Sequence, residues 1–175
     1  MQPNRSDIQL LEPNVERDAP FALSWFERPE GHATLISMGN AESEIESPTL
    51  EGEKETLREF ITLEKNGKQI TRMIVVDNKT IGAVWIELFE NHGVKLPSVH
   101  IIIGDPDYRG KGIGKSAMKA AIDYSKKLKF KTIYSRHLST NAPVSKLNDS
   151  LGFKNDGRPY KDENGLLWQN IRIDT

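Results

Sequence analysis

The chain has 175 residues and no cysteine, a length that suits one domain (residues 1–175) and a composition that excludes disulfides, thiolate metal ligands and a cysteine nucleophile. Its 24 basic and 25 acidic residues nearly cancel, to a net charge of −1, so we expect no nucleic-acid partner, which usually requires a basic excess. No stretch approaches the roughly 20 apolar residues of a membrane span, and no apolar run follows Met1, so we expect a cytoplasmic protein without a membrane segment or a signal peptide.

The first 65 residues have the pattern of helices. Asp18 followed by Pro20 has the order of an N-cap and a first-turn proline, which predicts a helix that starts there and ends before residue 29. A second, short helix is expected over residues 32–38. Residues 40–48 are polar enough to form a loop, and residues 50–63 are amphipathic with a helical period.

After residue 70 the pattern becomes that of strands. Residues 71–76 and 80–88 flank a polar turn and predict a hairpin. Residues 99–103 predict a third strand, apolar enough to be buried on both faces of a sheet. Residues 89–97 join the hairpin to this strand as a loop. A helix is expected from the glycines at 110–114 to about residue 127, since its apolar positions recur at helical spacings.

The last third of the chain predicts one more strand and helix, then a second hairpin. Residues 131–135 form the strand, and residues 143–151 form a helix that Gly152 ends. Residues 153–160 and 166–173 are expected to pair around an Asp-Glu-Asn-Gly turn. This order of elements predicts an α/β protein with a mixed sheet and helices on both faces.

A glycine-rich segment between the third strand and its following helix carries the clearest chemical signal. Its glycines let the backbone turn sharply with exposed N–H groups, at a helix N-terminus where amides lack partners and the dipole is positive. Such a turn binds phosphate oxygens. A tight turn with a solvated basic rim is the other interpretation. The segment consists of Arg109, Gly110, Lys111, Gly112, Ile113, Gly114 and Lys115.

Two other phosphate-binding motifs fit this segment poorly. The run Gly114-Lys115-Ser116 ends like the loop of P-loop nucleotidases, but the first glycine of that motif falls on Arg109. A relaxed dinucleotide-binding pattern runs from Gly112 to Ala117. However, polar and helix-breaking residues separate it from the preceding strand, where the dinucleotide fold has a tight turn.

Three motifs together resemble the GNAT superfamily of acetyltransferases. They are Arg109-Gly-Lys-Gly-Ile-Gly114 before an alanine-rich helix, then Asn141-Ala-Pro-Val-Ser145, then Leu151-Gly-Phe153. The resemblance covers residues 70–173 well and the earlier residues in outline. The spacings Asn-x-x-x-Ser and Gly-Phe-x-x-Asp-Gly are similar to the branch that holds the ribosomal-protein N-terminal acetyltransferases, with Asp156 where that branch commonly has Glu.

The resemblance implies a GNAT-like, mostly antiparallel twisted sheet and acetyl-CoA as cosubstrate. It implies that the backbone of Ile101 and Ile103 pairs with the pantetheine arm, and that Asn141 bonds the arm or the local backbone. It also implies that Ser145 lies near the thioester sulfur. By the habit of the family we expect a homodimer. The segment that would hold the CoA pyrophosphate comprises Arg109, Gly110, Lys111, Gly112, Ile113, Gly114 and Lys115.

The expected reaction needs a proton acceptor, because an amine must be neutral to attack a thioester. At pH 7 deprotonation costs about 1 kcal/mol for an α-amine and roughly 4–5 kcal/mol for a lysine. The candidate acceptors are Asp156, Glu87, His100 and Glu163; the resemblance favours Asp156, and a surface charge is its plain alternative. Ser145 would support the leaving thiolate, or serve only as a helix-turn hydroxyl.

We therefore expect an N-acetyltransferase that moves an acetyl group from acetyl-CoA to a primary amine by direct attack in a ternary complex. The acceptor stays open between a protein N-terminus and small-molecule amines such as polyamines, aminoglycosides and amino acids. The alternative is a non-catalytic module that only binds acetyl-CoA. No His, Cys or carboxylate cluster has the spacing of metal ligands, so we expect no metal.

Overall fold

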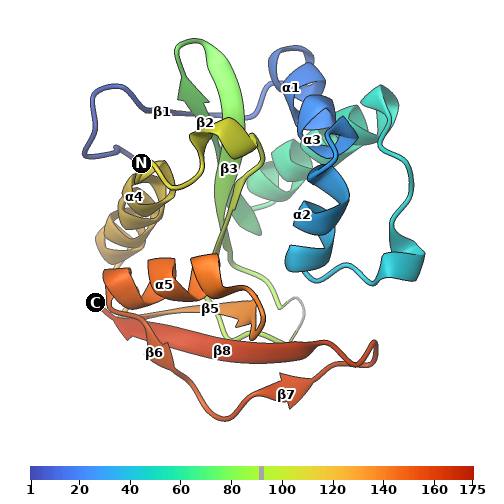
Figure 1. Ribbon diagram of the computed structural model, residues 1–175. Coiled ribbons are helices and arrows are strands. Elements are labelled where there is room, and N and C mark those ends of the chain that lie inside the picture. The colour runs from blue at the N-terminus through green and yellow to red at the C-terminus, as the bar shows by residue number, and fades with distance from the viewer. Residues whose placement is uncertain (91–92) are drawn as a thin grey trace.

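The computed structural model describes residues 1–90 and 93–175, and within them the strands form one sheet in the order β1-β2-β3-β4-β5-β8-β6, with β7 also on β8 (Figure 1). The helices are α1 (Val15–Glu27), α2 (Gly31–Ser37), α3 (Leu50–Lys65), α4 (Ile113–Lys127) and α5 (Ala142–Leu151). The strands are β1 (Gln9–Leu11), β2 (Gln69–Val76), β3 (Lys79–Glu87), β4 (Ser98–Ile103), β5 (Thr132–Leu138), β6 (Lys154–Asn155), β7 (Tyr160–Lys161) and β8 (Leu167–Asp174).

The sheet is mostly antiparallel and has helices on both faces, as predicted. Neighbouring strands run antiparallel except for β4 and β5, which are parallel. Helices α4 and α5 lie on one face, and α1, α2 and α3 lie on the other (Figure 1). Among the described helices none is both long and apolar enough to cross a membrane.

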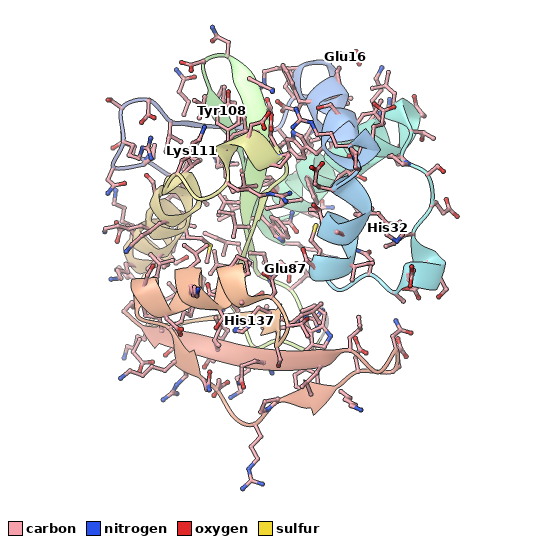
Figure 2. All side chains as sticks on the ribbon, in the orientation of Figure 1. Glu16, His32, Glu87, Tyr108, Lys111 and His137 are labelled. Carbon is pink, nitrogen blue, oxygen red and sulfur yellow. The ribbon has the colours of Figure 1, made fainter. Side chains whose placement is uncertain are left out.

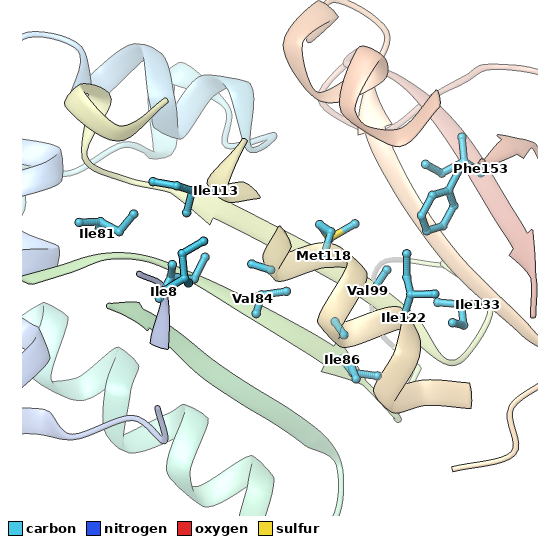
Figure 3. Packing of buried hydrophobic residues seen from close by; sticks show 14 of the residues in the cluster. Ile8, Ile81, Val84, Ile86, Val99, Ile113, Met118, Ile122, Ile133 and Phe153 are labelled. Carbon is cyan, nitrogen blue, oxygen red and sulfur yellow. The ribbon is translucent and has the colours of Figure 1, made fainter. Parts of the chain in front are cut away.

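Each face of the sheet has its own hydrophobic core, and β4 divides its side chains between the two. Val99 packs with Met118 and Ile122 of α4 (Figure 3). Ile102 packs on the opposite face with Trp25 of α1 and Leu57 of α3. Successive strand side chains alternate between faces, so Ile101 and Ile103 lie on the α4 face and His100 on the other. This alternation places the predicted site residues of β4 on two sides of the sheet.

The first helix starts earlier than predicted, and Asp18 is not its N-cap. The backbone N–H of Arg17 donates to Asn14 Oδ1 at 2.9 Å, so Asn14 caps a helix that begins at Val15. Asp18 is fully buried in the first turn, where Thr80 of β3 donates to its carboxylate at 2.7 Å and Arg17 pairs with it. Asn and Asp are equally good N-caps, so residue type alone does not choose between Asn14 and Asp18. The hydrogen bond from Thr80 holds the Asp18 side chain inside the protein, and Asn14 is the cap.

Most other predicted elements lie where expected, within a few residues, and the differences concern the sheet edges. The sequence did not predict β1, a short strand paired with β2. The single strand predicted over residues 153–160 is two short strands, because the chain leaves the sheet between Asn155 and Tyr160 through Gly157, at φ +91°, and Pro159. Part of the predicted loop over residues 89–97, residues 91–92, lies outside the described residues.

The parallel strands β4 and β5 diverge, and this opening determines where a ligand can bind. They pair at Ser98 and Tyr134, and the N–H of Tyr134 donates to the carbonyl of Pro97 at 2.9 Å. Beyond that point the strands carry no further register pairs. The prediction that the third strand is buried on both faces is therefore wrong for His100, Ile101 and Ile103, which are only partly buried because the opening lies beside them.

Candidate active site

A cavity of about 1440 Å³ occupies the opening between β4 and β5. Gly114, Met118 and Leu147 line it from the α4 and α5 face, whereas Trp85 and His100 line it from the face that carries α1–α3. The cavity therefore crosses the sheet and joins its two faces. Figure 2 shows Glu87 near the centre of the molecule, with Tyr108 and Lys111 at the turn before α4.

The glycine-rich turn has the backbone geometry expected of an anion-binding helix start. Gly110 and Gly112 have φ values of +71° and +77°, which only glycine adopts without strain. Gly112 is the N-cap of α4, so the first amides of a 15-residue helix follow it directly. Gly110, Gly112, Gly114 and Lys115 all line the cavity. The turn thus presents N–H groups at the mouth of the opening, on the α4 face.

The other three predicted members of this segment differ in their contacts with the cavity and with the rest of the protein. Ile113 is 2% exposed and packs in the core below the turn. Lys111 is exposed and does not line the cavity. Arg109 lines it, but its guanidinium donates to the carbonyls of Ile103 at 2.8 Å and Gly104 at 3.0 Å. It also donates to Thr34 of α2 at 3.0 Å, so Arg109 joins the turn, the end of β4 and α2.

The N-terminal segment supports the same turn, and no pattern in the sequence predicts this contact. Arg5 Nη1 donates to the carbonyl of Lys111 at 2.6 Å, and Ser116 Oγ donates to Asn4 Oδ1 at 2.6 Å. These contacts span more than 100 residues of sequence. They hold both the turn and the first helical turn of α4 in place.

The backbone of β4 directs polar groups into the opening at alternate residues. Ser135 Oγ of β5 donates to the carbonyl of Val99 at 2.7 Å, and Arg109 Nε donates to that of Ile103. Both carbonyls therefore point away from β3. By the alternation of a strand, the N–H and C=O of Ile101 point the same way, into the opening. The predicted pairing of Ile101 and Ile103 with an extended ligand is thus sterically available, with the Ile103 carbonyl already bonded to Arg109.

Asn141 occupies the start of α5 and bonds the local backbone. Its Oδ1 accepts from the N–H of Val144 at 3.3 Å as the helix N-cap, and its Nδ2 donates to the carbonyl of Ser37 at 3.2 Å. Asn141 also lines the cavity. It therefore fixes α5 against α2 at the rim of the opening.

The structure does not place the two predicted catalytic residues at the cavity. Val144 and Lys146 line it, whereas Ser145 between them does not. Asp156 follows β6 and pairs with Lys95, with Nζ–Oδ2 at 2.9 Å, also away from the cavity lining. Their catalytic roles, which rest on the resemblance, stay predictions.

A buried carboxylate, a serine and a histidine meet instead at the opposite face of the opening. Ser98 Oγ lies 3.2 Å from Glu87 Oε2 and 3.0 Å from His100 Nε2, and the last two atoms are 3.3 Å apart. If the serine hydroxyl donates to Glu87, it accepts from an Nε2–H of His100. This network assigns the ring proton to Nε2 and leaves Nδ1 as the acceptor. Glu87 and His100 both line the cavity.

Electrostatics keep Glu87 ionised in this buried position. Burial by itself raises the pKa of Glu87, but the interactions with His100, Trp85 and Ser98 outweigh it and bring the pKa below its ordinary value. Trp85 Nε1 lies 3.3 Å from Glu87 Oε1, and its ring stacks on His100 with centroids 5.4 Å apart. The carboxylate can therefore orient the imidazole and stabilise it once it is protonated.

Fold and cavity together define a protein with an opened sheet, whose cavity joins a glycine-rich helix start on one face to Glu87 and His100 on the other. The acetyltransferase (GNAT) domain family matches residues 9–154, so the chain belongs to this family and is an acetyltransferase that uses acetyl-CoA as cosubstrate. This match confirms the membership of the GNAT superfamily that the sequence motifs indicated. A search of curated protein sequences found no match to the chain.

Solved acetyltransferase structures share the fold over nearly the whole chain. A microcin self-immunity acetyltransferase, solved with acetyl-CoA and AMP, has 17% identity and a TM-score of 0.79, covering 98% of this chain and 94% of that one. A ribosomal-protein alanine acetyltransferase from Vibrio fischeri has 22% identity and a TM-score of 0.74, with coverage of 98% and 94%. Spermidine N-acetyltransferase from Vibrio cholerae, with CoA and spermine, has 16% identity and a TM-score of 0.73, with coverage of 97% and 96%.

Proposed function

We propose that this protein transfers the acetyl group of acetyl-CoA directly to a primary amine within a ternary complex. The observation that carries the proposal is the cavity that crosses the sheet. It joins the glycine-rich turn before α4 on one face to the Glu87–His100 pair on the other. A cosubstrate and an acceptor can therefore enter from opposite faces and meet in the opening, which is the arrangement that direct attack requires.

The residues of the α4 face fit acetyl-CoA. Backbone amides from Gly110 to Lys115 would hold the pyrophosphate at the start of α4, where the helix dipole favours anions. The backbone of Ile101 would pair with the pantetheine arm along the free edge of β4. The thioester supplies an activated acetyl group. A backbone N–H near Ile103 would stabilise the oxyanion that forms when the amine attacks.

The Glu87–His100 pair is the proton acceptor that the geometry favours. His100 Nδ1 would take the proton from the amine, directly or through a water molecule, while the Glu87 carboxylate beside Nε2 stabilises the imidazolium. Asp156 does not line the cavity, and it pairs with Lys95. We therefore propose His100 in the role that the resemblance suggests for Asp156.

The acceptor side of the cavity favours a cationic amine. The cavity lining includes the carboxylates of Glu30, Glu44, Asp162 and Glu163 in addition to Glu87, and it also includes the basic side chains of Arg109, Lys115, Arg136 and Lys146. Negative charges near a cationic amine would raise its affinity for the cavity and repel anionic acceptors. Ribosomal-protein N-termini and polyamines, the kinds of acceptor named for two of the solved structures, both satisfy this condition.

A screen of pooled amines and basic peptides tests the proposal. We expect CoA release above the hydrolysis background, together with a mass gain of about 42 Da on one acceptor class, the mass that one acetyl group adds in an N-acetylation. A non-catalytic acetyl-CoA-binding module is the competing function. Bound CoA without thiol release in any pool would favour the module and contradict the transferase.

Two further properties belong to the proposal because they follow from the resemblance and the composition. We propose that the chain forms a homodimer and acts in the cytoplasm. Light scattering at micromolar protein concentration decides the first, since a monomer mass there removes it. Localisation of a tagged chain in its own cell decides the second.

A further inference from the structure

The N-terminal segment, residues 1–8, contacts the glycine-rich turn from outside the cavity. Its last residue, Ile8, is 3% exposed in the core of the α4 face, and the residues before it lie beside the start of α4 (Figure 1). Arg5 Nη1 donates to the carbonyl of Lys111 at 2.6 Å. Gly112 lines the cavity, whereas no residue of the segment does. Arg5 therefore reaches the turn from the side away from a ligand.

This hydrogen bond determines the direction of one backbone N–H group. The peptide group between Lys111 and Gly112 is trans, so its C=O and N–H point in opposite directions. Because the C=O points to Arg5, the N–H of Gly112 points away from Arg5, toward the cavity side. No hydrogen bond between the described residues uses this N–H. It is an unused donor at a helix start, where anions bind.

The peptide group needs such a contact to keep one orientation. Gly112 has a φ of +77° and no Cβ, and a glycine peptide rotates with little steric resistance. An ideal Cβ built on Gly112 would meet only Arg5 Nη1, at 3.6 Å. The guanidinium of Arg5 is thus the neighbour that can hold this peptide group in place.

The ion pair of Arg5 indicates that its geometry matters more than its charge. Its Nε and Nη2 donate to the two carboxylate oxygens of Asp7, at 3.0 Å and 2.6 Å. This two-bond pairing fixes the plane of the guanidinium and directs Nη1 at the Lys111 carbonyl. An arginine that served only to attract an anion would be weakened by a paired carboxylate. The arrangement is that of a residue which positions the turn.

We propose that Arg5 is a positioning residue for the cosubstrate: it holds the Lys111–Gly112 peptide group so that the Gly112 N–H faces the CoA pyrophosphate before CoA binds. A donor that is already oriented costs less free energy to use in binding. The inference rests on the proposed placement of the pyrophosphate at this turn and is independent of the acceptor amine. It makes the N-terminal segment part of the cosubstrate site.

The variant Arg5→Met tests the inference by binding, with Arg58→Met as its matched control. Both side chains are partly exposed, 37% for Arg5 and 47% for Arg58, and both pair with carboxylates, but Arg58 lies on α3. We expect Arg5→Met to weaken CoA binding about tenfold in calorimetry, the order of one lost hydrogen bond. Its Tm should stay near that of the wild type, because exposed ion pairs contribute little. Arg58→Met should match the wild type in both.

Two further measurements separate positioning from a general effect. Acetylpantetheine, which carries the thioester and the arm but no phosphate, should bind Arg5→Met and the wild type equally. In a proton–nitrogen correlation spectrum, the Gly112 N–H resonance of the wild type should shift when CoA is added. In empty Arg5→Met it should already differ from the wild type and respond less to CoA. Arg5→Lys, which keeps a charged donor, should lose less CoA affinity than Arg5→Met.

The contrary outcomes are distinct. Unchanged CoA affinity in a folded Arg5→Met protein would overturn the inference. Equal losses for CoA and acetylpantetheine, or an unaltered Gly112 resonance, would reduce Arg5 to a general structural contact. If Arg5→Met does not fold, Arg5→Gln is tested by the same criteria. A wild-type Gly112 resonance that does not respond to bound CoA would instead contradict the proposed pyrophosphate site itself.

Discussion

Gly114→Asp is expected to abolish CoA binding while leaving the protein folded. Gly114 lies in the first turn of α4 at an ordinary helical φ, and an added Cβ would make only normal van der Waals contacts with Ile101, Ile103 and Leu147. The aspartate would place a negative charge where phosphates are proposed to bind. At roughly 5 Å and an effective dielectric constant of about 20, one such repulsion is worth about 3 kcal/mol, or on the order of a hundredfold in affinity.

A series at position 114 separates charge from bulk. Gly114→Ala should weaken CoA binding least, Gly114→Asn more, and Gly114→Asp most, with thermal unfolding near that of the wild type in each. Gly112→Asp should also abolish binding, but its φ of +77° adds backbone strain, so position 114 is the cleaner probe. Calorimetry that finds unchanged CoA affinity in a folded Gly114→Asp protein would remove the pyrophosphate from this turn.

His100→Asn is expected to lower kcat by about 10²- to 10³-fold near pH 7 and to change the shape of the pH–rate profile. Without the imidazole, the reaction depends on amine that has already lost its proton. Activity should therefore recover as pH rises through the pKa of the acceptor, about 8 for an α-amine. Glu87→Gln should act in the same direction with a smaller effect, because Glu87 orients and stabilises the ring without receiving the proton.

Matched variants decide whether the effect belongs to His100. His137 also lines the cavity, with Nδ1 3.0 Å from the carbonyl of Leu138, and His137→Asn should keep a wild-type profile. Asp156→Asn should do the same if its pairing with Lys95 is its main role. A profile altered by Asp156→Asn but not by His100→Asn would return the base to Asp156. In the same series, a ten- to hundredfold lower kcat in Ser145→Ala, with acetyl-CoA affinity unchanged, would support its predicted contact with the leaving thiolate.

Local sequence determined the parts of this protein that depend on short-range geometry. The glycines before α4 require a turn with positive φ at a helix start, and Gly152 ends α5 in the left-handed conformation. The hairpin of β2 and β3 and the amphipathic α3 follow from the period of their apolar residues. These signals involve neighbours within one or two turns of chain. Such local signals were sufficient to predict the fold class and the glycine-rich turn before α4.

Only the tertiary structure decided how the site is assembled. Ser98 joins Glu87 and His100 because the β3–β4 register pairs Glu87 with Ser98 and Trp85 with His100, and no local pattern specifies that register. The divergence of β4 from β5 opens the cavity, and neither Ser145 nor Asp156 lines it. Residue types predicted the chemistry, whereas burial and strand pairing, which depend on distant parts of the chain, decided which residues are proposed to perform it.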